Sequence, residues 1–146
     1  RGGAAARGGG GPSRRGGPAE LFAPPAANGP RQRSIRLSGS DWLERVTAAM
    51  AGLRADPPTA VAGREVQAVE DLLPGGRFEP SDVLIYTLDG ARLVVRPSGT
   101  EPKCKLYAEA VVPVADGDVA AARAAAAAVV ADVLQGAEDL LTARGL

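Results

Sequence analysis

The residues with the clearest potential for chemistry occupy positions 96–103, Arg-Pro-Ser-Gly-Thr-Glu-Pro-Lys. Arg96 offers a planar guanidinium fork that matches phosphate oxygens, and Ser98 and Thr100 offer short hydroxyl donors. Gly99 lets the backbone approach a ligand closely or adopt a positive φ. Fixed charge, short donors and backbone N–H groups on a stiff turn together make a cradle for an anion. The segment therefore predicts a phosphate-binding loop.

The flanking residues of this loop support two interpretations. Pro97 and Pro102 stiffen its two ends, and Lys103 adds a second cation that could equally be a solvated lysine at a strand end. Glu101 is acidic, so we expect it to shape the loop rather than touch an anion. A run of this composition is also compatible with an ordinary surface turn.

Other reactive residue types are scarce. Cys104 is the only cysteine and the chain has no histidine, so an internal disulfide is excluded and no partner is present to activate the thiol. We expect Cys104 to be a half-buried strand residue in a protein of a reducing, cytoplasmic compartment. Asp116-Gly117-Asp118 has the letters of a metal loop, but its position predicts a capped helix start, so no metal site is expected. Trp42 and Tyr107 are expected to pack between a helix and a sheet, with contact to the ligand as the alternative for Tyr107.

Two helices are predicted to frame this loop. Apolar residues recur at three- and four-residue spacing from 42 to 53, after Ser40 as the N-cap and before Pro57-Pro58. A second, alanine-rich helix follows Asp116 and Asp118. Gly136 lies inside it and favours a kink or break there, because glycine costs about 1 kcal/mol relative to alanine.

The remaining ordered segments alternate polar and apolar residues, as strands do. Asp89-Gly90 predicts a type I′ hairpin turn. The order of elements is strand, helix, four strands, helix, so we predict an α+β fold in which two helices cover one face of an antiparallel sheet. The predicted strands are residues 33–37, 65–69, 83–88, 93–95 and 105–112.

Residues 1–30 differ from the rest in composition. They are dominated by Gly, Ala, Pro and Arg, so they are predicted to be a disordered low-complexity segment ahead of a domain at 31–146. Residues 1–37 hold seven arginines and one acidic residue, whereas the remainder is acidic. Their Arg-Gly-Gly repeats resemble segments that bind RNA, which gives nucleic-acid binding through the tail as the alternative function.

A truncated or shifted reading frame would leave the same composition. Because the chain starts at Arg1, we expect a piece of something longer; no membrane-spanning segment is expected.

The loop also carries a family resemblance. Residues 96–103, continued by Lys105, Tyr107 and Glu109, closely resemble the C-terminal domain signature of the α-D-phosphohexomutases. The resemblance covers about residues 31–146 and implies a TATA-binding-protein-like layout of the kind read from the elements. The continuation after the loop looks more like phosphoglucomutase or phosphomannomutase than phosphoglucosamine mutase. Further upstream matches are residues 32–36 and the turn Asp89-Gly90.

The resemblance implies an isomerase that is an intramolecular phosphotransferase of carbohydrate metabolism. In that family a phosphoserine in the first domain reacts, Mg²⁺ sits in the second, a third reads the sugar, and the fourth grips the phosphate that is not reacting. By motif match, the substrate phosphate-binding residues would be Arg96, Ser98, Gly99 and Thr100, with Lys103 as the weaker match.

The chain departs from the full family pattern. It has no serine nucleophile loop, no metal loop and no sugar-reading loop, so no catalytic residue is predicted here and no cofactor is expected on this segment. The expected role is substrate-phosphate binding by a catalytically incomplete domain, whose partners are a phosphorylated sugar and the remaining mutase domains.

Overall fold

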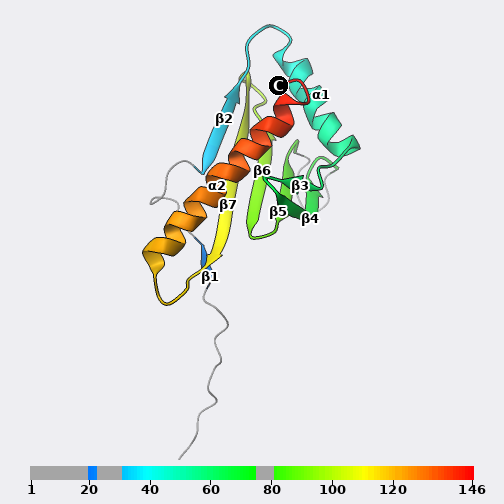
Figure 1. Ribbon diagram of the computed structural model, residues 1–146. Helices are drawn as coiled ribbons and strands as arrows, with labels where there is room; N and C mark the ends of the chain where they lie inside the picture. Colours follow the sequence, from blue (N-terminus) through cyan, green and yellow to red (C-terminus); the bar gives the residue numbers. More distant parts are fainter. Residues whose placement is uncertain (1–19, 23–30, 75–80) are drawn as a thin grey trace, which may run out of the picture.

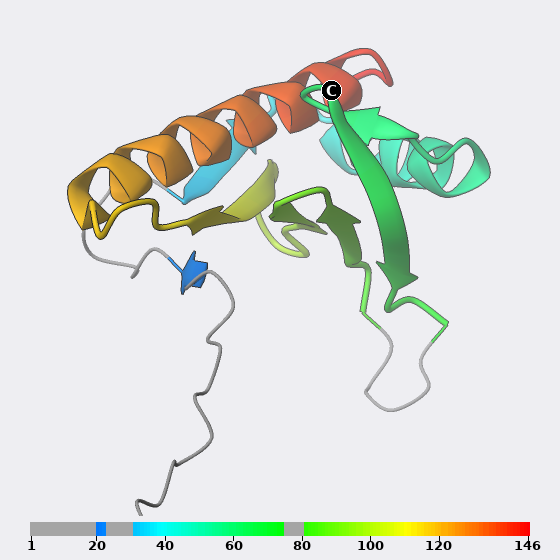
Figure 2. The same cartoon turned by 60° about the horizontal axis from the view of Figure 1, so that its bottom comes forward.

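The computed structural model describes residues 20–22, 31–74 and 81–146, and shows a curled antiparallel sheet with both helices on one face (Figures 1 and 2). This confirms the predicted α+β class, in which strand, helix, four strands and helix follow one another as β2, α1, β4 to β7 and α2. The structure adds β1 and β3. The elements are β1 (Glu20–Phe22), β2 (Gln32–Arg36), α1 (Trp42–Ala55), β3 (Ala60–Val61), β4 (Arg64–Asp71), β5 (Leu84–Leu88), β6 (Ala91–Pro97), β7 (Lys103–Pro113) and α2 (Val119–Thr142).

Strand β7 is the axis of the sheet. One of its edges pairs with β6, and the sheet continues through β5 and β4 to the short β3. Its other edge pairs with two strands in line, β2 beside Lys103–Tyr107 and β1 beside Val111–Pro113. Because β7 lies between two neighbours along most of its length, its residues have fixed positions relative to both.

The core lies between the sheet and the helices. Alternate residues of β5, β6 and β7 face the helices and are buried, so the opposite face of these strands is free of helices. Aliphatic side chains and alanines dominate this core, as the low aromatic content requires. The helical contribution is Val46, Ala49, Met50 and Leu53 from α1, and Ala122, Ala126, Val130, Val133, Leu134, Ala137 and Leu141 from α2.

Arg33 fixes β2 to α2. Its guanidinium Nη1 donates to Gln135 Oε1 at 3.0 Å and to Glu138 Oε2 at 2.9 Å. Since Arg33 points toward α2, the residues on either side of it in β2, among them Ser34, lie on the helix-free face of the sheet. Ser34 is thereby placed opposite Lys105 of β7.

The predicted capped start of α2 is confirmed, whereas the predicted N-cap of α1 is wrong. Asp118 is the N-cap of α2, and its carboxylate accepts the backbone N–H of Ala121 at 3.0 Å, as a capping role requires. The prediction of Ser40 as the N-cap of α1 was wrong. Gly39, at φ 95°, turns the chain so that Asp41 occupies the cap position, and Asp41 makes no side-chain cap bond. Its carboxylate lies 4.0 Å from Arg45 Nη1 instead.

The structure also corrects the predicted turn type at Gly90 and the predicted break at Gly136. The predicted hairpin at Asp89-Gly90 is confirmed, because Leu88 of β5 pairs with Ala91 of β6. Its predicted turn type is wrong: Gly90 has φ 70°, but Asp89 is absent from the described non-glycine residues with positive φ, so the turn is not type I′. The turn with positive φ at both central residues is Ala62-Gly63, between β3 and β4. Helix α2 runs unbroken through Gly136, where Ala62 of that turn approaches the helix closely.

The expectation of no membrane-spanning segment does not hold by length and composition alone. Within the described ranges, α2 is the one helix that satisfies both criteria, with a mean hydropathy of 1.4 over its most apolar window. Alanines supply most of that apolar character, and the larger buried side chains of α2 pack against the sheet. These criteria are weak evidence for a membrane helix because core helices also satisfy them.

The N-terminal predictions fall mostly outside the described residues. Residues 1–19 and 23–30, including the Arg-Gly-Gly repeats, are not described, so tail disorder and nucleic-acid binding stay predictions. Within the predicted disordered range, the structure describes one strand, β1, paired with β7.

Candidate functional site

The loop between β6 and β7 is closed by its own hydrogen bonds. The backbone N–H of Ser98 donates to the Lys103 carbonyl at 2.9 Å, and the Lys103 N–H donates to the Glu101 carbonyl at 2.7 Å. The Ser98 hydroxyl oxygen accepts the N–H groups of Thr100 at 3.5 Å and Glu101 at 3.2 Å. Ser98 therefore shapes the loop as an acceptor, while its hydroxyl hydrogen remains to donate to a ligand.

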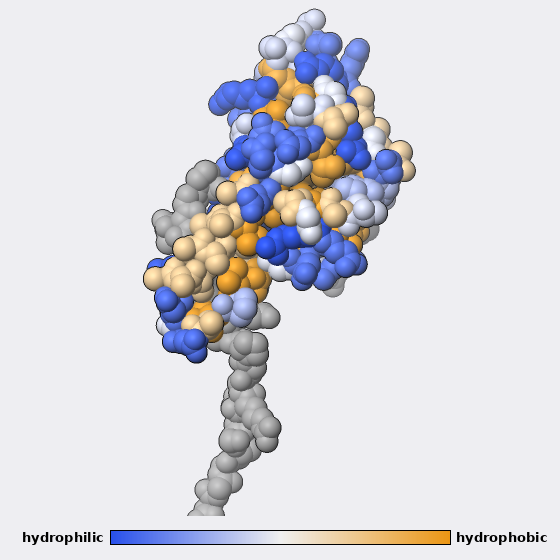
Figure 3. Space-filling view, in the orientation of Figure 1, coloured by the Kyte–Doolittle hydropathy of each residue, from blue (hydrophilic) through white to orange (hydrophobic). Residues whose placement is uncertain are grey.

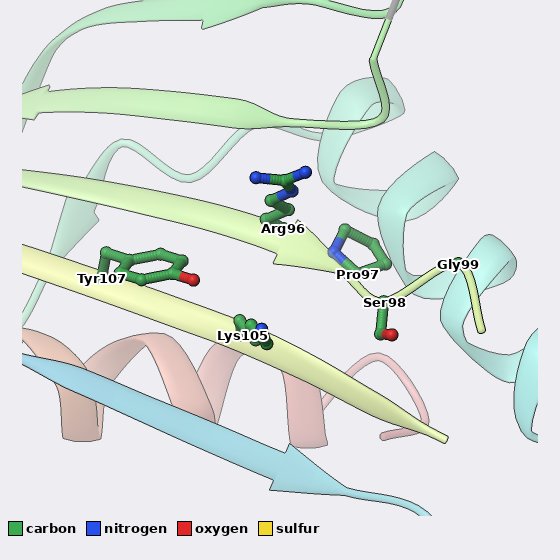
Figure 4. A pocket seen from close by; sticks show the side chains of 6 residues that line it. All are labelled: Arg96, Pro97, Ser98, Gly99, Lys105 and Tyr107. Carbon is green, nitrogen blue, oxygen red and sulfur yellow. The ribbon is translucent and has the colours of Figure 1, made fainter. Parts of the chain in front are cut away.

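A pocket of about 200 Å³ opens beside this loop on the helix-free face of the sheet (Figure 4). The side chains come from the end of β6, the first half of β7 and the start of the loop. The hydroxyl of Tyr107 points along β7 toward the loop end of the pocket. The pocket-lining residues are Arg96, Pro97, Ser98, Gly99, Lys105 and Tyr107.

Two cations line this pocket from adjacent strands. Arg96 on β6 is the register partner of Lys105 on β7, so both side chains lie on the same face of adjacent strands. Like charges directly opposite in a sheet are destabilising. Neither residue forms an ion pair with any part of the chain that the structure describes. The pocket thus holds two cations that are not ion-paired, which favours an anion.

The structure brings three of the five predicted site residues to the pocket. Arg96, Ser98 and Gly99 line it, whereas Thr100 and Lys103 lie outside its lining. Lys103 Nζ lies 2.6 Å from Glu101 Oε2, and this hydrogen bond lowers the pKa of the Glu101 carboxyl. The second cation of the pocket is therefore Lys105, which the sequence analysis did not assign to the site. The available signal was strand alternation, which puts Lys105 on the same face of β7 as Tyr107, the residue expected at the ligand in the alternative interpretation.

Two roles were expected for Gly99, a positive φ or close approach of its backbone to a ligand, and the first of them is wrong. Its φ is not positive, so it does not serve as a left-handed turn residue. Space around it is open, because a Cβ built at this position would meet nothing within 4 Å. Gly99 thus leaves its backbone accessible from the pocket.

Tyr107 and Cys104 occupy opposite faces of β7. Tyr107 is half-buried on the helix-free face, so the prediction that it packs between helix and sheet was wrong and its alternative, at the ligand site, fits its position. Strand alternation places Cys104 in the core, where it is fully buried rather than half-buried. Burial raises the pKa of the Cys104 thiol to about 12, so it lacks thiolate character.

The described residues offer no fit for a divalent cation. They contain no group of three or more His, Cys, Asp or Glu side chains that could hold a metal ion. In the segment resembling a metal loop, Asp118 caps α2 and Asp116 has φ 53°, a turn conformation.

Comparison with known proteins identifies relatives of the same region. Residues 43–126 match the family model described as phosphoglucomutase/phosphomannomutase, C-terminal domain. A probable phosphomannomutase of Haemophilus influenzae is 42% identical over 80 residues, 54% of this chain and 16% of that protein. A phosphoglucomutase of Staphylococcus aureus (strain USA300) is 33% identical over 86 residues, 51% of this chain and 16% of that protein. The matched segment is thus a small share of each relative's length.

Proposed function

The chain belongs to the phosphoglucomutase/phosphomannomutase family, as a C-terminal domain of that type, and from this premise we propose that it binds the phosphate group of a phosphorylated sugar. Arg96, Ser98 and Gly99 would contact the phosphate oxygens from the pocket. Thr100 and Lys103 are proposed as further contacts on the motif match alone.

The observation that carries the proposal is the pair Arg96 and Lys105, which lie opposite each other and form no ion pair with the described part of the chain. Such a pair costs stability in the free protein. A bound anion would relieve that repulsion and accept charge-assisted hydrogen bonds from both side chains. The Ser98 hydroxyl and the exposed backbone at Gly99 supply neutral donors beside the cations.

Simple energetics indicate how strongly this pocket should bind by itself. Hydrogen bonds to a charged group contribute roughly 1.5–3 kcal/mol each. Association costs on the order of 4–15 kcal/mol, so a few contacts leave a dissociation constant in the millimolar range or weaker. Tighter binding would require the other domains of a mutase to close over the sugar. The chain is accordingly proposed as a substrate-holding element and not as a catalyst on its own.

A titration followed by NMR tests the proposal at these affinities. We expect glucose 6-phosphate to shift the amide signals of residues 96–107 in the ¹⁵N-labelled chain. Arg96→Ala should remove these shifts. Arg92→Ala is the matched control, because Arg92 lies on the same strand and face but opposite Glu109, outside the pocket lining. Equal loss in both variants, or no shifts in the parent chain, would refute phosphate binding at this pocket.

A longer mutase of the family offers a kinetic test. The substitution equivalent to Arg96→Ala removes a contact that exists in both the ground state and the transition state. It should therefore raise KM more than it lowers kcat. A collapse of kcat at constant KM would contradict the holding role.

A further inference from the structure

We propose that the outer edge of β4 binds an extended peptide strand that carries a basic residue opposite Glu70. This edge is a surface separate from the phosphate pocket, because β5 lies between β4 and the strands that line the pocket. The proposal therefore goes beyond the proposed phosphate binding and does not depend on it.

Strand β4 has a neighbour along only part of its outer edge. Its inner edge pairs with β5 from Val66 to Asp71, whereas its outer edge pairs with β3 only at Arg64 and Glu65. The four consecutive residues 67–70 are all exposed. Among the strands that the structure describes, none covers this second half of the outer edge (Figures 1 and 2).

The hydrogen bonds of β4 show which backbone groups remain at the open edge. The Leu72 N–H donates to the Val83 carbonyl at 3.1 Å, so the backbone groups of Leu72 point to the side of β5. Because these groups alternate between the two edges of a strand, the N–H and C=O groups of Val69 and Asp71 point outward. The register shift of β4 lies before this stretch and leaves its alternation regular. Two such residues at alternate positions match the donors and acceptors of an added antiparallel strand.

The side chains at this edge differ between its two faces. Val69 is 44% exposed on the helix side of the sheet, where it is the register partner of Tyr86. Glu70 lies on the helix-free face opposite Ile85, and it forms no ion pair with the described part of the chain. An added strand thus meets an exposed apolar side chain on one face and an acidic side chain on the other.

The wider charge around this edge is also acidic. On the helix-free face, the cation Arg92 is two strands away from β4, as the partner of Thr87, which pairs with Ala68. The ion pairs at the end of β4 do not reverse its sign, because one arginine binds two carboxylates there. Acidic residues outnumber basic ones by four to two in the set formed by β4 and these ion pairs, namely Glu65, Glu70, Asp71 and Asp82 against Arg54 and Arg64.

Glu70 decides which strand this edge accepts. If β4 paired antiparallel with β4 of a second copy, the outward groups of Val69 would match those of Asp71 in the other copy. That register places Glu70 directly opposite Glu70, and like charges directly opposite each other are destabilising. A lysine or arginine at the same place is attracted instead, and an apolar residue beside it covers Val69. The occupant that fits is therefore a basic, extended segment of another protein.

The test uses two acetylated and amidated peptides, Thr-Thr-Thr-Lys-Val-Thr-Thr and Thr-Thr-Thr-Glu-Val-Thr-Thr, which differ only at the residue placed opposite Glu70. Each is titrated into the ¹⁵N-labelled chain at pH 7 and followed by NMR. The lysine peptide should shift the amide signals of Val69 and Asp71. Its dissociation constant should be in the millimolar range, because so short a strand makes few contacts. It should bind roughly three- to tenfold more tightly than the glutamate peptide.

Three variants separate the contributions of charge and backbone. Glu70→Lys should reverse the preference, so that the glutamate peptide binds more tightly. Glu65→Lys is the matched control, because it changes the net charge equally at a β4 residue already covered by β3, and it should keep the preference. Val69→Pro removes an outward N–H group and leaves the ladder with β5 intact, so it should abolish the shifts with both peptides. Unchanged amide signals in β5, β6 and β7 report an intact fold in each variant.

Each contrary result overturns a stated part of the proposal. An unchanged preference in Glu70→Lys, or an equal reversal in Glu65→Lys, overturns recognition of a basic residue by Glu70. Absent shifts at Val69 and Asp71 in the parent chain, or binding that survives Val69→Pro, overturn strand addition. Shifts at these two residues that grow with protein concentration alone show that a second copy occupies the edge, which overturns the choice of occupant. None of these results bears on phosphate binding, which is measured at residues 96–107.

Discussion

Tyr86 of β5 is the largest side chain that the core encloses completely, with 1% of its surface exposed. Its hydroxyl is buried and has no hydrogen-bond partner among the described protein atoms, and burial raises the pKa of Tyr86. An unsatisfied buried hydroxyl costs about 1–3 kcal/mol. We expect Tyr86→Phe to raise the free energy of unfolding by about 1 kcal/mol in urea titrations. A destabilisation of similar size would show that the hydroxyl has a bonding role.

Cys104 gives a second residue-scale prediction. Because its thiol is buried and its pKa is raised to about 12, it should resist a thiol reagent at pH 8 in the folded chain. It should react at once when the chain is unfolded in urea, as a colorimetric thiol assay would measure. Rapid labelling under native conditions would contradict the placement of Cys104 in the core.

The residues of the site were predictable to different degrees. Arg96 and Ser98 stand in one short string whose chemistry can be read without a fold. Lys105 and Tyr107 required knowledge of which β7 residues share a face with Arg96, and that depends on pairing register rather than on the string. Lys103 was expected to add charge to the site, but its neighbour Glu101 binds it. The pairing of Lys103 with Glu101 depends on the conformation of the loop, so the order of residues alone does not reveal it.

At the scale of elements, Gly136 is the contact point between α2 and the β3–β4 turn. A Cβ at this position would lie 3.0 Å from Ala62 N, 3.2 Å from Ala62 Cβ and 3.3 Å from Val61 Cγ1. Alanine usually improves a helix by about 1 kcal/mol over glycine. Here we expect Gly136→Ala to lower the free energy of unfolding by about 1 kcal/mol, because the crowding outweighs that gain.

The control for Gly136 is Ala131→Gly at an exposed position of the same helix. It should destabilise by about 1 kcal/mol through propensity alone. Thermal unfolding of both variants measures the comparison. A stabilised Gly136→Ala would show that the β3–β4 turn can shift to accept the methyl group.

Arg54 joins α1 to both ends of the segment between β4 and β5. Its guanidinium lies 2.9 Å from Asp71 Oδ2 and 2.6 Å from Asp82 Oδ1. The hydrogen bond from Arg54 lowers the pKa of the Asp71 carboxyl. A pKa that is lower in the folded chain means that this carboxyl adds stability above its ordinary pKa, about 3.9. That stability is lost as the pH falls through the lowered value.

We therefore expect the parent chain to lose more stability than Asp71→Asn between about pH 5 and pH 2. Urea unfolding at a series of pH values measures the difference. Parallel pH profiles for the two proteins would show that the Arg54–Asp71 pair is not stabilising.

The helices and strands themselves were largely predictable, because the three- and four-residue spacing and the alternation are local signals. What was missed depends on contacts between distant segments. The Ala62-Gly63 turn packs closely against α2 at Gly136, where a glycine leaves room for it. This contact explains why a glycine occurs inside an unbroken helix. Read alone, Gly136 indicates a weak point in a helix.

At the scale of the whole molecule, the described hydrophobic core contains no residue before Ile35. Beyond the core, β1 pairs with Val111–Pro113 at the end of β7. Removing residues 1–22 should therefore leave the fold and the pocket intact while it exposes this edge. We expect faster amide exchange at the end of β7, with unchanged phosphate-induced shifts at 96–107. General unfolding of the shortened chain would contradict this division.

The surface of the described domain is also uneven in character. Figure 3 shows a broad pale apolar area over the first half of α2, where several alanines and Val119 are exposed. The helix-free side of the sheet carries the cations instead. One side of the sheet thus packs against the helices, and the other lines the pocket.

The residues of β7 alternate between the two sides of the sheet. Cys104, Leu106 and Ala108 belong to the interior, while Lys105 and Tyr107 belong to the pocket. For protein engineering this interleaving is useful. The outward positions can be exchanged for those of a related enzyme to graft a new ligand preference, while every inward position keeps its native residue. An insertion or deletion of a single codon in β7, by contrast, would exchange the two sets and destroy folding and recognition together.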